Sequence, residues 1–472
     1  MAALVKELLG QKLVRVNMIT EEQLQSALEW QKLHGGKLGR NLIALGSLSH
    51  RELSAFLKKH PDVPETLEET GLGLSFLTDL VLKHVLFRGG FTIADVAASV
   101  KLPRSIVNAA LEELRREKFI EVKGASQLAT ASYQFQLTEQ GKNRASELLD
   151  ICRYAGPAPV VLDQYWEMVE LQTIRSILVE ENSVRKAFSS LVLSERMLRR
   201  LGPAVSSGKA IFLYGPSGNG KTTIAETIGT LLPDEVYMPY SLIVGGQIIS
   251  IFDPISHITV PYEIRANSID QRWVPIKRPV IMMGGELSPR MLELDFNSIS
   301  KFYDAPLQMK ANNGLFIVDD FGRQQISPQS LLNRWIVPLE RRTDFMSLHT
   351  GMKFDIPFDQ LVIFATNMEP GKLVDEAFLR RIRYKIKVTH PTEEEFEAIF
   401  KKVCEANKIE FKKDAFDYLV KNFYKKLGTK FNSCHPRDFV DQIIDDANYY
   451  NRPAEMTRES LTSAWEDYFL DM

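Results

Sequence analysis

The sequence lacks the features that mark secreted and membrane-spanning proteins. Only 3 cysteines occur among 472 residues, Cys152, Cys404 and Cys434, and they form no C-x-x-C pair. Scattered single cysteines are typical of a reducing compartment. No apolar run approaches the ~18 residues that a membrane-spanning helix needs, and no signal-like apolar segment follows Met1. We therefore expect a cytoplasmic protein without a membrane span.

The chain also has almost no net charge. Its 58 Lys and Arg residues and 60 Asp and Glu residues leave a formal charge of −2. Overall charge therefore gives no general attraction to nucleic acid or to an anionic membrane. The hydrophobic content of 44% is ordinary for a globular protein. A chain of this length is sufficient for about three domains.

A phosphate-binding loop is the clearest motif that the sequence does contain. An apolar strand candidate from Ala210 runs into a G-x-x-x-x-G-K-[ST] pattern, and a helical pattern over residues 222–232 follows. Glycines let successive N–H groups point at phosphate oxygens, and the following helix adds its positive end. In this motif Lys221 reaches the β- and γ-phosphates, and the Thr222 hydroxyl ligates Mg²⁺. The residues predicted to hold ATP are Gly215, Pro216, Ser217, Gly218, Asn219, Gly220, Lys221, Thr222 and Thr223.

Two later strand candidates end in polar residues. Residues 315–318 are apolar and lead into Asp319 and Asp320, and the strand candidate over 361–366 leads into Asn367. Continuous apolar runs are typical of strands buried in a parallel sheet, and ligands bind at the carboxyl ends of such strands. Asp319 is predicted to hold Mg²⁺, Asp320 to polarise the attacking water, and Asn367 to orient that water or contact the γ-phosphate. A buried strand ending in an acidic turn is the structural alternative.

Two arginine-containing segments follow these motifs, first Arg380, Arg381 and Arg383 and later Pro436-Arg437. In this order the motifs resemble those of the AAA+ ATPase family. The resemblance implies a P-loop core with a parallel sheet between helices over residues 156–390 and a helical lid over 391–472. It also implies ATP hydrolysis and a homo-oligomer, in many members a hexameric ring. Arg437 would contact nucleotide from the lid. One of the three earlier arginines would act on the neighbouring subunit's nucleotide, unless they form a solvated basic helix end.

Two details refine this resemblance. The family usually carries Asp-Glu after its acidic strand, whereas this chain has Asp319-Asp320, so turnover is expected to be slow or to serve a nucleotide switch. A hairpin candidate over residues 345–357 resembles the pre-sensor-1 hairpin of the helicase and MoxR-like branches. Lys353 on it would touch a threaded polymer, or the hairpin is a surface ribbon. A second hairpin is expected around Gly245-Gly246.

The N-terminal segment contains an internal repeat. Residues 8–31 and 37–60 each join a Leu-Gly-containing stretch to an amphipathic helix pattern that begins with a capping box. The repeat, within a domain over 1–65, resembles the N-terminal domain of type II secretion and type IV pilus assembly ATPases (the MshE/GspE family). The resemblance implies cyclic di-GMP binding and a client in a pilus or secretion system. Leu8, Asn17 and His60 depart from the family's motif, and a helical docking module is the alternative.

Residues 66–155 are predicted to form a winged helix. Three helical patterns, at 74–87, 92–100 and 104–118, precede two alternating strand candidates at 119–124 and 132–137. This resembles winged helix-turn-helix domains. Residues 74–150 carry 10 basic and 9 acidic residues, so attraction to phosphate nearly cancels. Docking of a protein and binding of DNA are both open, and protein docking is favoured.

The sequence as a whole predicts a multidomain α/β protein that binds and hydrolyses ATP. We expect an AAA+ protein that remodels or regulates a protein partner. The alternatives are a DNA-binding regulator or motor acting through the winged helix, and an adaptor that binds nucleotide without useful turnover.

Overall fold

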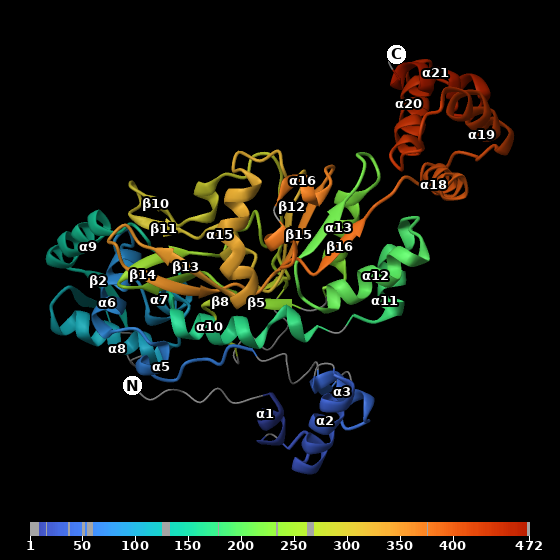
Figure 1. Cartoon of the computed structure of the whole chain (residues 1–472). Coiled ribbons are helices and arrows are strands. Elements are labelled where there is room, and N and C mark those ends of the chain that lie inside the picture. Colours follow the sequence, from blue (N-terminus) through green and yellow to red (C-terminus); the bar gives the residue numbers. More distant parts are fainter. Residues whose placement is uncertain are drawn as a thin grey trace.

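A computed structural model describes residues 9–15, 17–35, 38–49, 52–53, 60–124, 133–177, 179–232, 235–261, 269–374 and 376–469. At its centre lies a five-stranded sheet in the order β16-β4-β15-β12-β9, with all neighbouring strands parallel. The strands are β4 (Ile211–Tyr214), β9 (Val280–Met283), β12 (Leu315–Val318), β15 (Leu361–Thr366) and β16 (Tyr384–Lys387). This confirms an α/β protein with a parallel sheet (Figure 1).

Alternate residues of these strands enter two different cores, as expected for a sheet covered on both faces. Ile211, Leu213 and Ile317 pack in one cluster, whereas Phe212, Phe316 and Phe364 pack in the other. The first cluster is covered by helices α11 (Glu181–Ala187), α12 (Glu195–Ser206) and α13 (Lys221–Thr230). The second is covered by α15 (Pro328–Arg341), with α16 (Pro370–Leu373) and α17 (Glu376–Leu379) following β15.

A second, β-rich unit lies mostly between α13 and β12, and in this stretch the sequence predicted only the hairpin around Gly245-Gly246. Its sheet has the order β10-β11-β7-β6-β3, and β5 and β8 form an antiparallel ribbon beside it. The bounds are β3 (Val160–Val161), β5 (Glu235–Pro239), β6 (Ser241–Val244), β7 (Gln247–Ser250), β8 (Trp273–Lys277), β10 (Asp295–Asn297) and β11 (Phe302–Asp304). The helices of this part are α10 (Leu162–Leu171) and α14 (Leu307–Lys310). The 3-10 turns η2 (Ile174–Ser176), η3 (Phe188–Ser190) and η5 (Pro289–Leu292) bury Ile174, Phe188 and Leu292 in the two cores of the parallel sheet.

Both predicted hairpins are confirmed. β6 and β7 pair antiparallel around Gly245-Gly246, and β13 (Thr343–Ser347) pairs antiparallel with β14 (Lys353–Pro357). The second hairpin buries Met346 and Phe354 in the core of the β-rich unit, while Lys353 is exposed. One face of this hairpin therefore packs on its own subunit.

The described residues between 66 and 155, called the winged-helix elements below, form the three predicted helices and two predicted strands together with two further helices. They are α5 (Leu67–Thr70), α6 (Leu74–Val85), α7 (Ile93–Val100), α8 (Arg104–Arg116), β1 (Ile120–Gly124), β2 (Gln134–Leu137) and α9 (Glu139–Ile151), and β1 pairs antiparallel with β2. Their core includes Ile248 of β7, and the Tyr154 hydroxyl lies 2.7 Å from Ser241 Oγ of β6. The winged-helix elements are thus joined to the β-rich unit through shared core contacts.

At the N-terminal end, α1 (Leu9–Arg15), α2 (Glu21–His34) and α3 (Leu38–Ala44) enclose a small core of their own. The capping box of Thr20 and Gln23 is confirmed, and Ser49 and Glu52 exchange the equivalent hydrogen bonds. Leu8 and most of the second predicted helix fall outside the described residues. Asn17 adopts a positive φ of 57°, a conformation that glycine adopts at lower cost.

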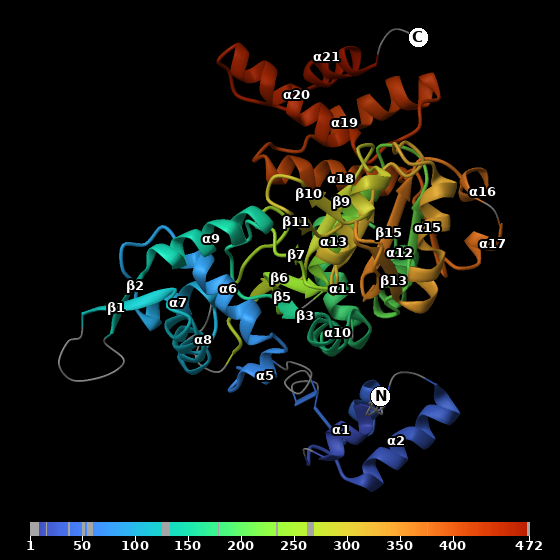
Figure 2. The ribbon, with the colours of Figure 1, turned by 90° about the vertical axis from the view of Figure 1, so that its left-hand side faces the viewer.

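Four helical segments form the C-terminal region, called the lid below, as the sequence predicted. They are α18 (Glu393–Ala406), α19 (Lys413–Leu419, continued by a π-helical stretch Val420–Lys425), α20 (His435–Tyr449) and α21 (Arg458–Tyr468). An aromatic-rich core including Phe396, Phe400 and Trp465 holds them together. In both views these red helices lie at the opposite side of the molecule from the blue helices α1–α3 (Figures 1 and 2).

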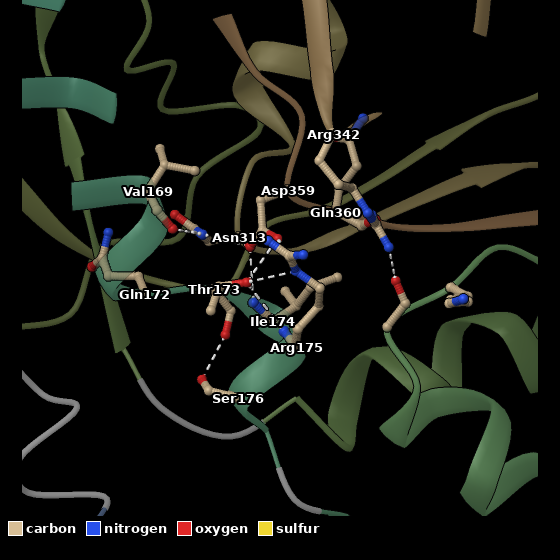
Figure 3. A network of polar contacts seen from close by, with 12 residues as sticks. Val169, Gln172, Thr173, Ile174, Arg175, Ser176, Asn313, Arg342, Asp359 and Gln360 are labelled. Atoms are coloured by element: carbon tan, nitrogen blue, oxygen red, sulfur yellow. Dashed lines mark hydrogen bonds and ion pairs between the residues drawn. The ribbon is translucent and has the colours of Figure 1, made fainter. Parts of the chain in front are cut away.

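A buried polar junction ties α10 to the amino-terminal ends of the parallel strands (Figure 3). The Asp359 carboxylate accepts hydrogen bonds from Thr173 Oγ1 at 2.8 Å and from the Ile174 N–H at 2.9 Å. Asn313 Nδ2 donates to the same carboxylate at 3.0 Å. This junction fixes the edge of the sheet that lies opposite the phosphate-binding loop.

Among the described residues, no helix is both long and apolar enough to cross a membrane.

Candidate nucleotide site

The predicted loop lies where β4 ends and α13 begins. Gly215–Gly220 form the loop, and Lys221, Thr222 and Thr223 form the first turn of α13. Gly215 has a φ of 147°, and a Cβ there would lie 1.9 Å from the Val388 carbonyl oxygen. Gly218 and Gly220 have φ of 74° and 77°. The motif's glycines are therefore required by backbone conformation and, at Gly215, by close contact with the segment after β16.

Lys221 is buried beneath this loop. Its side chain is bonded through Nζ to the carbonyl oxygens of Gly215 at 3.0 Å and Pro216 at 2.8 Å. Burial lowers the pKa of Lys221, and the nearby carboxylates of Asp320 and Asp319 act in the opposite direction. The ammonium group can reach a phosphate only by turning away from these carbonyls.

The two predicted metal ligands lie side by side. The Thr222 hydroxyl donates to the Asp319 carboxylate at 2.8 Å, although the residues are 97 positions apart in the chain. β12 and β4 are separated in the sheet by β15, so the α13 turn and the end of β12 meet across that strand. A hydroxyl and a carboxylate oxygen at this separation are the hard oxygen donors that Mg²⁺ prefers.

Asp320 and Asn367 are brought together at the same edge of the sheet. Asn367 Nδ2 donates to an Asp320 carboxylate oxygen at 3.1 Å. Asp320 has a φ of 46°, a left-handed conformation that aspartate tolerates better than most residues. The predicted water-polarising carboxylate is therefore oriented by its backbone and by the neighbouring strand's amide.

Gln324 supports this acidic turn and was not identified from the sequence. Its Nε2 donates to the Asp319 carbonyl oxygen at 2.7 Å, and its Oε1 accepts from the Gly322 N–H at 2.8 Å. Both bonds join residues close together in the chain. A glutamine a few residues after an acidic strand end is therefore the sequence pattern that could have predicted this role. The turn that carries Asp320 is thereby closed on itself.

The predicted arginines lie away from their own chain's loop. Arg380 pairs with Glu376 at 3.3 Å, and Arg381 pairs with Glu340 of α15 at 2.5 Å. With Arg383 they precede β16, whose first residue Tyr384 is in register with Ile211 at the start of β4. They therefore lie near the amino-terminal edge of the sheet, opposite the loop.

Arg437 lies in the first turn of α20. Its side chain is 70% exposed and pairs with Asp438 at 3.7 Å. In the described part of the chain, no hydrogen bond or ion pair joins Arg437 to the loop. The lid nevertheless touches the loop through other residues, because the Cys434 N–H donates to the Gly218 carbonyl oxygen at 2.9 Å.

Comparisons with known proteins give limited matches. A family described as a domain of unknown function (DUF8689) matches residues 392–467, the helices of the lid. The lipoprotein-releasing system ATP-binding protein LolD 2 of Rhodospirillum rubrum is 42% identical over 55 residues, which are 12% of this chain. The chain spans about a quarter of that relative's length, 24%.

Solved structures give low similarity scores. A RuvB mutant of Thermotoga maritima has a TM-score of 0.33 at 12% identity, with 63% of this chain and 74% of that chain covered. NtrX from Brucella abortus has 0.37 at 15%, with 62% and 59% covered. Domain III of the replication initiation protein DnaA of Thermotoga maritima has 0.35 at 13%, with 61% and 98% covered. The chemistry of the site is therefore inferred from its own geometry.

Proposed function

We propose that this chain is an AAA+ ATPase that remodels or regulates a protein partner. The observation that carries the proposal is the 2.8 Å hydrogen bond between the Thr222 hydroxyl and the Asp319 carboxylate beside a glycine-rich loop. This contact places a P-loop hydroxyl, an acidic strand end and the Asp320–Asn367 pair at one edge of one sheet. A glycine-rich turn without a ligand would not require the carboxylates of Asp319 and Asp320 beside it.

The residues present fit ATP with Mg²⁺. The loop N–H groups and the amino end of α13 would hold phosphate oxygens, and Lys221 would pair with them. Thr222 and Asp319 would hold the metal. A metal held by these two residues would supply positive charge that offsets the negative charge developing during phosphoryl transfer.

Asp320 supplies the proton acceptor in this proposal, and Asn367 holds its carboxylate in place. An aspartate reaches less far than a glutamate by one methylene, and misplacement of a catalytic group by about 1 Å can cost roughly 100-fold in rate. We therefore propose slow turnover for the isolated chain. In the ring that we propose, Arg380, Arg381 or Arg383 would approach the nucleotide of the neighbouring subunit.

The test compares two variants with matched controls. Asp320→Asn keeps the size of the side chain and removes the proton acceptor, so ATP still binds while hydrolysis falls at least about 100-fold. Lys221→Ala weakens ATP binding itself. The controls are Asp304→Asn and Lys209→Ala, exposed residues of β11 and of the segment before β4, and both leave binding and hydrolysis unchanged. Hydrolysis that persists in Asp320→Asn would refute the assigned role.

The remaining parts of the chain are proposed as accessory domains. We propose divisions at residues 1–65, 66–155, 156–390 and 391–472, a hexameric ring in the cytoplasm, and a client in a pilus or secretion system. The three free cysteines suit a reducing compartment. Cyclic di-GMP is the proposed ligand of residues 1–65, and calorimetry on the full chain tests it. If titration with cyclic di-GMP gives no heat of binding, the proposal for this segment becomes a docking module.

DNA binding is the second candidate function, and α8 gives a reason to rank it lower. Arg115 pairs with Glu112 at 3.2 Å, and Arg116 pairs with Glu113 within the same helix. Arginines neutralised by their own helix contribute little to phosphate attraction. A DNA-binding role requires affinity for mixed-sequence DNA that falls steeply between 50 mM and 200 mM salt, on the order of 1,000-fold for several phosphate contacts.

A further inference from the structure

The lid is attached to the phosphate-binding loop through amide side chains. Asn219, in the middle of the loop, is only 4% exposed. Its Nδ2 donates to Asn432 Oδ1 at 3.3 Å, and its Oδ1 accepts from the Ser433 N–H at 3.1 Å. A buried amide that both donates to and accepts from the opposite segment fixes the orientation of the two segments as well as their separation.

Backbone packing strengthens this attachment. The Cys434 N–H donates to the Gly218 carbonyl oxygen at 2.9 Å. A Cβ at Gly218 would lie 2.7 Å from Cys434 Sγ and 3.6 Å from the Cβ of Asn432. The loop and the lid segment are therefore in van der Waals contact, and one cannot shift toward the other independently.

Asn432 also contacts the connection to the lid and the lid's interior. His390, which lies between β16 and α18, places its Nδ1 2.9 Å from Asn432 Oδ1. On the lid side, Asn432 Nδ2 lies 3.3 Å from Nε2 of the buried His435, whose Nδ1 lies 2.7 Å from the Tyr424 hydroxyl. One asparagine thus joins the loop, the core-to-lid connection and the lid core.

Within the loop, Lys221 and Asn219 share a carbonyl acceptor. The Pro216 carbonyl oxygen lies 2.8 Å from Lys221 Nζ and 3.4 Å from Asn219 Nδ2, so the two donors share one acceptor. When Lys221 turns toward a phosphate, the Pro216 carbonyl is left to the Asn219 amide. The same amide also donates to the Ser217 carbonyl oxygen at 3.2 Å and to Asn432 Oδ1 at 3.3 Å, so the carbonyl that binds Lys221 also contacts the side chain that binds the lid.

We propose that Asn219 and Asn432 are positioning residues that make the phosphate-binding loop and the lid move as one unit, so that their contact sets the rate of nucleotide release. This inference rests on the proposed nucleotide site. It assigns the connection to the asparagine pair rather than to Arg437, which is 70% exposed and pairs with Asp438. Opening the lid then requires the hydrogen bonds of Asn219 to Asn432 and Ser433 to break, together with the backbone bond from Cys434 to Gly218.

The first test measures release of a fluorescent ADP analogue (mant-ADP) from the full chain by stopped flow. Asn219→Ala and Asn432→Ala are each expected to raise the release rate at least about fivefold, because each removes the hydrogen bond between the two asparagines, and Asn219→Ala also removes the acceptor of the Ser433 N–H. The double variant is expected to release more slowly than the product of the two single effects predicts, because both changes remove the Asn219–Asn432 hydrogen bond. Asn407→Ala is the matched control, since Asn407 Nδ2 donates to the Val403 carbonyl of its own helix at 3.0 Å and, among the described residues, makes no bond to the loop. Rate increases that multiply in the double variant would overturn the proposal.

The second test needs no nucleotide. Hydrogen exchange of the Ser433 and Cys434 amides in the full chain is expected to speed up at least about fivefold in Asn219→Ala, since Ser433 loses its acceptor. Unchanged exchange there would overturn the contact, and with it the inference. If the wild-type chain does not bind mant-ADP, the proposed function fails and the release step fails with it. The exchange result then still decides whether loop and lid are joined.

Discussion

Replacing Asp270 by asparagine should weaken the junction between the β-rich unit and the chain around residues 61–70 and 159. Arg272 and Asp270 form a buried ion pair at 2.8 Å, with side chains 2% and 4% exposed. The same guanidinium donates to the carbonyl oxygens of Thr70 at 3.2 Å and Pro159 at 3.3 Å. The Asp270 N–H donates to the Pro61 carbonyl oxygen at 2.9 Å. Four stretches of chain therefore meet at one charge pair.

The cost follows from burial. Asp270→Asn keeps the size of the side chain but leaves the Arg272 charge uncompensated, and it turns an amide N–H₂ toward a guanidinium N–H. Breaking a buried pair by removing one partner costs about 3–5 kcal/mol. With a urea m-value of about 1–3 kcal/mol/M, the unfolding midpoint of this unit should fall by on the order of 2 M.

The assay follows urea unfolding by hydrogen exchange of residues 60–72 and of residues 269–277, the stretch that carries Asp270 and Arg272. Local probes are needed because a chain with several cores need not unfold in one step. Asp295→Asn is the control, since Asp295 pairs with Arg290 at 2.7 Å but the two side chains are 48% and 80% exposed. An exposed pair contributes about 0–1 kcal/mol. Equal losses in the two variants would refute the reasoning.

Two further predictions concern helical glycines and a lid histidine. Gly141→Ala should destabilise the winged-helix core by about 1–3 kcal/mol because its Cβ would meet the Phe119 carbonyl oxygen at 2.0 Å. Gly202→Ala, whose Cβ meets only Val184 Cγ2 at 3.5 Å, should stabilise its helix by about 0.5–1 kcal/mol. Thermal unfolding that moves both variants in the same direction would contradict this. Burial lowers the pKa of His435 to about 4, with Asp438 opposing this shift and His390 adding to it. Because the folded pKa lies below the unfolded one, lid stability should fall by about 2 kcal/mol from pH 7.5 to pH 5. Denaturant midpoints for the His435→Gln variant should lose this part of the pH dependence, and an unchanged slope would contradict it.

The winged-helix region shows how far local sequence patterns reach. The helix over residues 104–118 was expected from its apolar spacing, and the structure ends it at Arg116. The strands before Asp319 and Asn367 were expected from continuous apolar runs, and both are buried along their whole length. These patterns succeed because the periodicity of a helix or a buried strand is set by residues near one another in the chain.

The β-rich unit contains strand pairings that such local patterns do not predict. β3 pairs with β6, and β11 with β7, across intervals that no turn motif specifies. Such pairings depend on which apolar faces meet in the folded chain, and short strands carry too few residues to specify a register. The position of Arg380 and Arg381 at the edge opposite the loop follows from the direction of β16, which the arginines' own sequence does not specify.

The phosphate-binding loop, the acidic strand end and the asparagine strand end were determined by the sequence alone, because glycine spacing and apolar runs are local signals of backbone geometry. Only the tertiary structure brought Thr222 to Asp319 and Asp320 to Asn367, because β4, β15 and β12 pair side by side in one parallel sheet. It alone also joined Asn219 to Asn432, 213 positions away. An asparagine pair of this kind leaves no periodic trace in a sequence, because it depends on where the lid comes to rest on the loop.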